Sequence, residues 1–150
     1  MSSSPEGRQG APFKMVVERG KIREFARATK SDNPDYLGGD QPLTPVTFLV
    51  TSGFWQDASN SPWGDGPRNF ERILHGEQEF VFFGEPPRAG DVLTGVSRIE
   101  RVYEKEGRRG GAMKFTEAVT EFRDPVGKLV AESRTTSIET GQAPTSGDAS

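Results

Sequence analysis

The feature that most constrains the fold is a run of four strand-like segments in the carboxy-terminal half of the chain. These segments are residues 77–83, 91–104, 112–123 and 128–140. Breaks that contain glycine or proline separate them, and Asp124-Pro-Val-Gly127 is a strong β-turn signal between the last two. Because short connections join antiparallel neighbours, we expect one long antiparallel sheet.

The amino-terminal half begins with a short strand and a helix. Residues 13–17 alternate in the manner of a strand. The residues after Gly20 predict a helix, because Ile22 and Phe25 recur on one face with charged residues opposite. We expect the helix to end at Asn33-Pro34, since the residue before proline is pushed out of helical geometry.

A second helix is predicted to follow. Thr44 is a suitable N-cap, and Pro45 suits the first helical position because no hydrogen bond is lost there. The apolar residues that follow occupy more than one side, so we expect this helix to be largely buried. They are Val46, Phe48, Leu49, Val50, Phe54 and Trp55.

These elements predict an α+β domain in which a long antiparallel sheet wraps around a central apolar helix, each layer hiding the apolar side of the other. A generic α+β sandwich is the alternative. We expect one domain over residues 12–140, with mobile tails at 1–11 and 141–150, which are rich in Ser, Gly, Pro and Ala. Apolar residues make up only 32% of the chain, which favours an oligomer over an isolated monomer.

Composition excludes several classes of function. The chain has no cysteine and one histidine, His75, so neither a disulfide nor a transition-metal site is expected. Nineteen basic and 22 acidic residues are interspersed, which gives no basic face for nucleic acid. Neither a signal peptide nor an apolar run long enough to span a membrane is seen, so a cytoplasmic protein is the simplest interpretation.

Several motifs together resemble the MaoC-like dehydratase family, in particular its amino-terminal, FAS1-like dehydratase domain. They extend from about Phe13 to Thr140, and their order and spacing carry the resemblance. The motifs are Arg19-Gly-Lys-Ile-Arg-Glu-Phe-Ala-Arg-Ala28, Asp32-Asn-Pro-Asp-Tyr36, Pro45-Val-Thr-Phe48, Leu74-His-Gly-Glu-Gln-Glu-Phe80 and Arg88-Ala-Gly-Asp-Val-Leu93.

The resemblance implies a single hot-dog fold, pairing of two such folds, and acyl thioesters of coenzyme A or acyl carrier protein as substrates. No cofactor is implied beyond the carrier that the substrate brings. Active members of the family add water to a 2-enoyl thioester, or remove it. They use an Asp-x-Asn-Pro-x-His motif whose Asp and His share one water as general base and acid.

This chain departs from the active motif at both catalytic positions. Aligned on Asn33-Pro34, Ser31 stands at the Asp position and Tyr36 at the His position. Asp32 is one place away. A phenol with a pKa near 10 is a poor substitute for imidazole, and serine needs a base beside it. The resemblance therefore implies a non-catalytic subunit whose hot-dog partner carries the intact Asp and His.

The candidate site residues follow from the same comparison. His75 and Asp32 are the weak candidates for a catalytic role, and a structural hydrogen bond or a place in the lining of the substrate site is favoured for His75 over a direct chemical role. Asn33-Pro34 either shapes a functional loop or only ends a helix. The candidate substrate-binding residues are Asn33, Tyr36, Phe48, Trp55, His75 and Gly76.

Three functions remain open at this point. The first is a subunit of an enoyl-thioester hydratase or dehydratase that shapes the substrate tunnel while its partner supplies the dyad. The second is a stand-alone acyl-thioester binding or structural protein without dehydratase activity. The third is a self-sufficient hot-dog enzyme that uses His75 with Asp32. The expected partner is a hot-dog subunit with the intact Asp and His motif, or a second copy of this chain in a homodimer.

Overall fold

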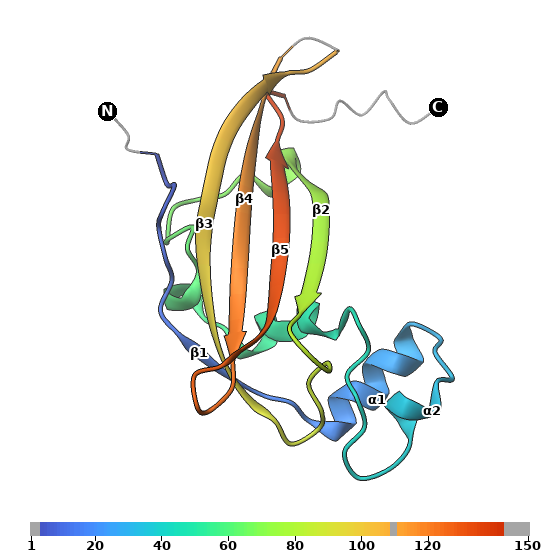
Figure 1. Ribbon diagram of the computed structural model, residues 1–150. Helices are drawn as coiled ribbons and strands as arrows, with labels where there is room; N and C mark the ends of the chain where they lie inside the picture. Colours follow the sequence, from blue (N-terminus) through green and yellow to red (C-terminus); the bar gives the residue numbers. More distant parts are fainter. Residues whose placement is uncertain (1–3, 109–110, 143–150) are drawn as a thin grey trace.

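The computed structural model describes residues 4–108 and 111–142 (Figure 1). Five strands form one antiparallel sheet in the order β1-β3-β4-β5-β2. The strands are β1 (Phe13–Val16), β2 (Ile73–Phe82), β3 (Val92–Glu106), β4 (Ala112–Arg123) and β5 (Leu129–Glu139). The helices are α1 (Arg19–Ala28) and α2 (Pro34–Leu37), with the 3-10 helices η1 (Phe48–Trp55), η2 (Ala58–Asn60) and η3 (Phe70–Arg72). This is the α+β arrangement that the strand and helix pattern predicts.

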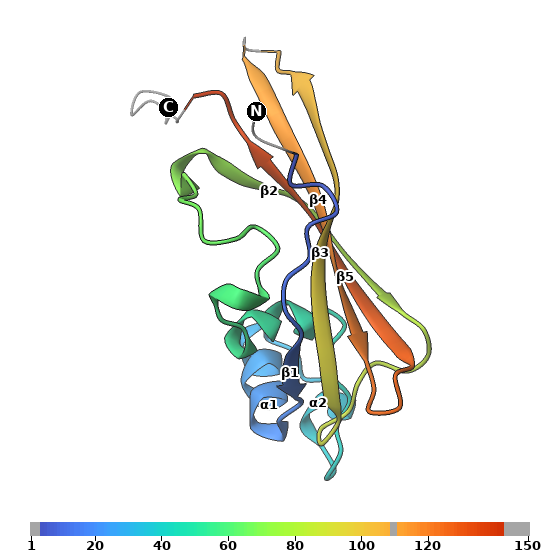
Figure 2. The ribbon, with the colours of Figure 1, turned by 90° about the vertical axis from the view of Figure 1, so that its left-hand side faces the viewer.

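The core lies between the helical layer and one face of the sheet, which we call the covered face (Figure 2). Cross-strand neighbours on this face form one row through all five strands: Phe13, Gly95, Phe122, Ala131 and Phe82. The rings of Phe13 and Phe122 meet edge to face, with centroids 6.2 Å apart. A Cβ atom on Gly95 would lie only 2.6 Å from Cε1 of Phe13. Glycine therefore allows the Phe13 ring to lie directly on β3.

The turn between β4 and β5 forms at the predicted residues. The Asp124 carboxylate oxygen Oδ1 accepts hydrogen bonds from the amides of Val126 and Lys128, at 3.0 and 2.9 Å. Gly127 has φ of 87°, a left-handed conformation that glycine adopts without the strain of a side chain. This short connection fixes the register of the last two strands.

Part of the segment predicted to be an amino-terminal tail pairs with the sheet instead. The amides of Gly7 and Gly10 donate to the carbonyls of Ile99 and Ser97, both at 2.9 Å, and the Ile99 amide donates to Arg8 at 2.9 Å. Residues 7–10 therefore extend the backbone pairing with β3 along the same edge that β1 occupies. Of the predicted carboxy-terminal tail, residues 143–150 lie outside the described residues.

The second predicted helix is a 3-10 helix and begins at Phe48, after the predicted start at Pro45. Residues 48–55 form 3-10 turns, and Thr44 does not cap them: it is buried, and its Oγ1 has no hydrogen-bond partner among the described residues. β-Branched residues weaken the α-helical preference of this segment. The hydroxyl of Thr51 also donates to the carbonyl of Phe48 at 2.8 Å, an interaction within one tight turn.

The burial prediction for this helix was also wrong for half of its apolar residues. Phe48 and Leu49 are buried in the core, as predicted. Val46, Val50 and Phe54 are instead 57%, 56% and 79% exposed. We call these three residues the exposed stripe. Three large exposed apolar side chains close together in the sequence leave apolar surface that folding of the single chain does not bury.

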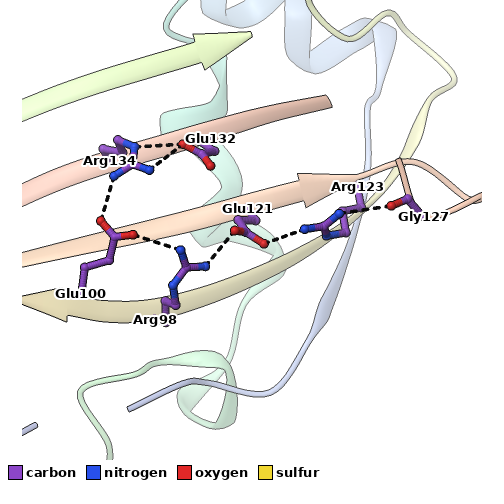
Figure 3. A network of polar contacts seen from close by, with 7 residues as sticks. All are labelled: Arg98, Glu100, Glu121, Arg123, Gly127, Glu132 and Arg134. Carbon is purple, nitrogen blue, oxygen red and sulfur yellow. Dashed lines mark hydrogen bonds and ion pairs between the residues drawn. The ribbon is translucent and has the colours of Figure 1, made fainter. Parts of the chain in front are cut away.

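The other face of the sheet, which we call the open face, carries a network of ion pairs (Figure 3). Arg98 of β3 bridges to β4, since its Nη1 lies 2.8 Å from Glu121, and its Nη2 lies 3.0 Å from Glu100 on its own strand. Glu100 in turn lies 2.8 Å from Arg134. The members of the network are Arg123, Glu121, Arg98, Glu100, Arg134 and Glu132. The alternating charges link β3, β4 and β5 side by side.

This network predicts that the fold loses stability in acid. Hydrogen bonds from Arg98 above all, and also from Arg123, lower the pKa of Glu121 below its usual value of 4.5. Because the folded pKa is the lower one, the stabilisation is present above the unfolded pKa and is lost as the pH falls through the folded pKa. We expect urea melts between pH 7 and pH 3 to show the free energy of unfolding falling below about pH 5.

The Glu121→Gln variant is expected to lose part of that pH dependence, because the titrating carboxyl is gone. Glu104→Gln is the matched control, since Glu104 is an exposed carboxylate on β3 outside the network. Equal pH dependence in the wild type and in the Glu121→Gln variant would contradict the assignment.

Candidate functional site

The loop between α1 and α2 holds Ser31 and Asn33, and Pro34 is the first residue of α2; all three belong to the segment that the sequence predicts to correspond to the Asp-x-Asn-Pro-x-His motif. Asn33 is the N-cap of α2, and its Oδ1 accepts a hydrogen bond from the Asp35 amide at 3.0 Å. The Ser31 hydroxyl oxygen accepts from the Asn33 amide at 3.4 Å. α1 already ends at Ala28. Asn33 thus shapes the loop and caps the start of α2. The prediction that Asn33-Pro34 ends the first helix was wrong, because α1 has already ended.

Three aromatic site candidates belong to the core or its edge. Phe48 is fully buried and meets Phe25 edge to face, with ring centroids 5.6 Å apart at 81°. Tyr36 and Trp55 are half-buried and pack against the same core cluster. In the isolated chain, Phe48 therefore lines no open surface, whereas Tyr36 and Trp55 lie at the boundary between the core and the surface.

His75 and Gly76 lie on β2, which is an edge strand of the sheet. His75 is exposed and stands opposite Ser137 of β5. The pairing register shifts between His75 and Glu77, so Gly76 is the extra residue of a β-bulge. A Cβ atom on Gly76 would lie 2.8 Å from Cδ1 of Ile138. The structure therefore gives Gly76 a packing role in the bulge.

Within one chain, His75 and Asp32 do not come together. Asp32 lies in the α1–α2 loop, at the end of the sheet where β2 finishes (Figure 1). His75 is near the start of β2, and seven residues of extended strand, about 23 Å, separate it from Phe82 at the far end. A shared water would need both groups within hydrogen-bond reach. The two weak catalytic candidates therefore form no dyad in this chain.

Asn60 is an important residue that the sequence did not single out. Its side chain is buried, and its Nδ2 donates to the carbonyls of Ala11 and Pro12 at 3.0 and 3.2 Å. Its Oδ1 accepts from the Asp57 amide at 2.8 Å. Asn60 thus ties η2 to the segment before β1. A lone Asn in a loop rich in Gly and Pro gives no sequence signal of such long-range contacts.

Comparison with known proteins assigns the family. A family model described as "FAS1-like, dehydratase domain region" matches residues 6–133 of the chain. The chain belongs to this family. A UPF0336 protein of Mycobacterium tuberculosis is 31% identical to this FAS1-like dehydratase domain over 136 residues, which are 85% of this chain and 78% of the relative.

Solved structures show the same fold. The C-terminally truncated HadBC complex, a 3R-hydroxyacyl-ACP dehydratase from M. tuberculosis, matches with a TM-score of 0.71 and 25% identity, covering 91% of this chain and 99% of that one. The ChsH1–ChsH2 complex from M. tuberculosis matches with a TM-score of 0.67 and 13% identity, covering 92% and 87%. The FAS1-like dehydratase domain thus has the MaoC-like, single hot-dog fold that its motifs predict.

Within the described ranges of this FAS1-like dehydratase domain, no helix is both long and apolar enough to cross a membrane.

Proposed function

We propose that this chain is one subunit of an acyl-thioester hydratase or dehydratase, and that a hot-dog partner supplies the catalytic Asp and His. The observation that carries the proposal is the state of the α1–α2 loop. The loop is built as a capped turn around Asn33, and in the alignment on Asn33-Pro34 Ser31 and Tyr36 fall at the positions of the motif's Asp and His.

The chemistry of hydration explains why these two residues do not suffice. A base must take a proton from water as the oxygen adds to C3 of the enoyl group, and an acid must protonate C2. One group has to change protonation state near neutral pH. Neither Ser31 nor Tyr36 supplies an imidazole or a carboxylate, and His75 stands too far along β2 to assist the loop. Hydration adds only the proton and the hydroxyl group of one water across the double bond. The proposal therefore needs no cofactor beyond the carrier of the thioester.

A partner surface is available beside the loop and the helical layer. β2 forms an edge of the sheet, so the outward backbone groups of this strand are open to pairing with a second strand. The exposed stripe of Val46, Val50 and Phe54 lies in η1 and just before it, in the helical layer. A second hot-dog subunit that covers both would extend the sheet and bury the stripe together.

The comparisons support this division of labour. HadBC is a complex and a 3R-hydroxyacyl-ACP dehydratase, and ChsH1–ChsH2 is also a complex. In the proposed role, this chain contributes the partner interface and part of the acyl pocket, with Tyr36 and Trp55 at its boundary. Acyl thioesters of coenzyme A or of a carrier protein are the proposed substrates.

The test is a hydration assay on a short 2-enoyl thioester such as crotonyl-coenzyme A. We expect the homogeneous chain to show no rate above the uncatalysed reaction. Together with a hot-dog protein that carries the intact motif, the rate should rise by about 10²- to 10⁴-fold, the usual contribution of general acid–base catalysis. Full activity of the chain alone would refute the proposal.

Two controls make the assay specific. A partner whose motif His is replaced by Ala should give an inactive pair. The His75→Ala variant of this chain should give a pair with an unchanged kcat at saturating substrate and partner, because His75 lies outside the proposed dyad. A large loss of rate on His75→Ala would instead favour an enzyme that relies on its own imidazole.

A further inference from the structure

A polar cavity lies on the covered face of the sheet, near the start of β2. The segment between η2 and η3 runs along this side toward β2 (Figure 2), and it encloses about 390 Å³ against β4 and β5. Two cross-strand pairs line the sheet side, Lys114 with Glu139 and Thr116 with Ser137. Because residues opposite each other in a ladder point to the same face, these four side chains share the cavity wall.

The charges in this cavity are unbalanced. Arg8, Arg68 and Lys114 line it together with a single carboxylate, Glu139. That carboxylate also has a cation at its side, since Nη2 of Arg72 lies 3.9 Å from its Oε1. Across the described part of the chain, none of the three lining cations forms an ion pair. The cavity is therefore positive, although the whole chain has a net charge of -3.

The two arginines are held in place before any ligand arrives. Nη1 of Arg8 donates to the carbonyl of Trp63 at 3.1 Å. The guanidinium of Arg68 lies 4.7 Å from the centre of the Trp63 ring and 5.5 Å from that of Phe70. Burial lowers the pKa of the Arg68 guanidinium, while Glu139 acts in the opposite direction. A partly desolvated cation is stabilised by an anion that binds beside it.

We propose that this cavity binds a phosphate group of the thioester carrier. The inference rests on the proposed function, because coenzyme A and the prosthetic arm of acyl carrier protein both carry phosphate. The planar guanidinium of arginine matches two phosphate oxygens, and lysine adds a point charge. The hydroxyls of Thr116 and Ser137 supply further donors from the sheet. Together these groups form a carrier-phosphate site on the non-catalytic subunit.

Fluorescence of Trp63 gives a direct test in the full chain without a partner. The sequence has two tryptophans, so the Trp55→Phe variant leaves only the one that lines the cavity. We expect its emission to change saturably with adenosine 3′,5′-bisphosphate or with phosphopantetheine. In that background, Lys114→Gln should raise the Kd about tenfold or more, since a hydrogen bond to a charged group is lost.

Arg101→Gln is the matched control, because Arg101 is an exposed cation that lies over the Tyr103 ring and outside the cavity. It should leave the Kd unchanged. A response to the bisphosphate alone would identify the nucleotide end of coenzyme A, and a response to phosphopantetheine would identify the phosphate that both carriers share.

A response to neither compound, or equal weakening by Lys114→Gln and Arg101→Gln, would overturn the inference. That result leaves the proposed function standing if the pair still hydrates its substrate. Conversely, hydration by the chain alone would refute the proposed function whether or not phosphate binds.

Discussion

Val50→Asp is expected to abolish assembly with a hot-dog partner and to leave the fold of the isolated chain intact. Val50 is 56% exposed, so an aspartate at this position stays solvated in the free chain. In the proposed complex the same carboxylate would be buried without a counter-charge, which costs about 3 kcal/mol or more. The Kd of the complex should rise by about 100-fold or more, measured by size-exclusion chromatography with light scattering and by titration calorimetry.

Val126→Asp is the matched control for this prediction. Val126 is an 88% exposed valine in the turn between β4 and β5, far along the chain from the exposed stripe. The chemical change is the same, so a general effect of added negative charge would appear in both variants. Full assembly of Val50→Asp, or equal loss in Val126→Asp, would rule out the exposed stripe as the partner surface.

Gly95→Ala is expected to destabilise the fold strongly, although it adds only one methyl group. The new Cβ would overlap the Phe13 ring, lying 2.6 and 2.8 Å from its Cε1 and Cε2. Phe13 cannot move without disturbing its edge-to-face contact with Phe122 at the centre of the core. We expect a loss of about 2 to 3 kcal/mol, the usual cost of overpacking. The melting temperature should fall by about 5 to 12 °C in thermal melts followed by circular dichroism.

Gly20→Ala provides the contrast. Gly20 lies in α1 with no atom within 4 Å of its added Cβ, so alanine should raise stability by about 0.5 to 1 kcal/mol through helix propensity. Adding Phe13→Leu to Gly95→Ala should recover part of the loss, since the smaller side chain leaves room for the methyl group. A Gly95→Ala protein that melts like the wild type would mean that Phe13 does not lie on β3.

The strands were predictable because their signals are local. Gly127 and Asp124 define the last turn, and the predicted bounds of β4 match the observed strand. The limits of β2 were less predictable, since it begins at Ile73, four residues before the predicted start at Glu77. Pairing with β5 extends this strand through the bulge at Gly76. Tertiary pairing of this kind has no marker within the segment itself.

The helical segment before β2 was harder to predict for a different reason. Apolar residues on all sides predict a buried helix, yet Val46 and Phe54 are exposed in the single chain. Sequence hydrophobicity does not distinguish burial in one's own core from burial against another subunit. The cavity around Arg68 was missed because its members, such as Arg8 and Lys114, meet only through the fold.

The segment of residues 7–10 limits how many copies of a chain can join by strand addition. This segment pairs with β3 ahead of β1 in the chain, and Pro12 lies between the two. That side of the sheet therefore offers only short, interrupted stretches of backbone for hydrogen bonding. β2 presents ten residues on the opposite side. Strand addition then has a single site per molecule, the outer edge of β2. Such assembly closes after two members and does not propagate into a fibre.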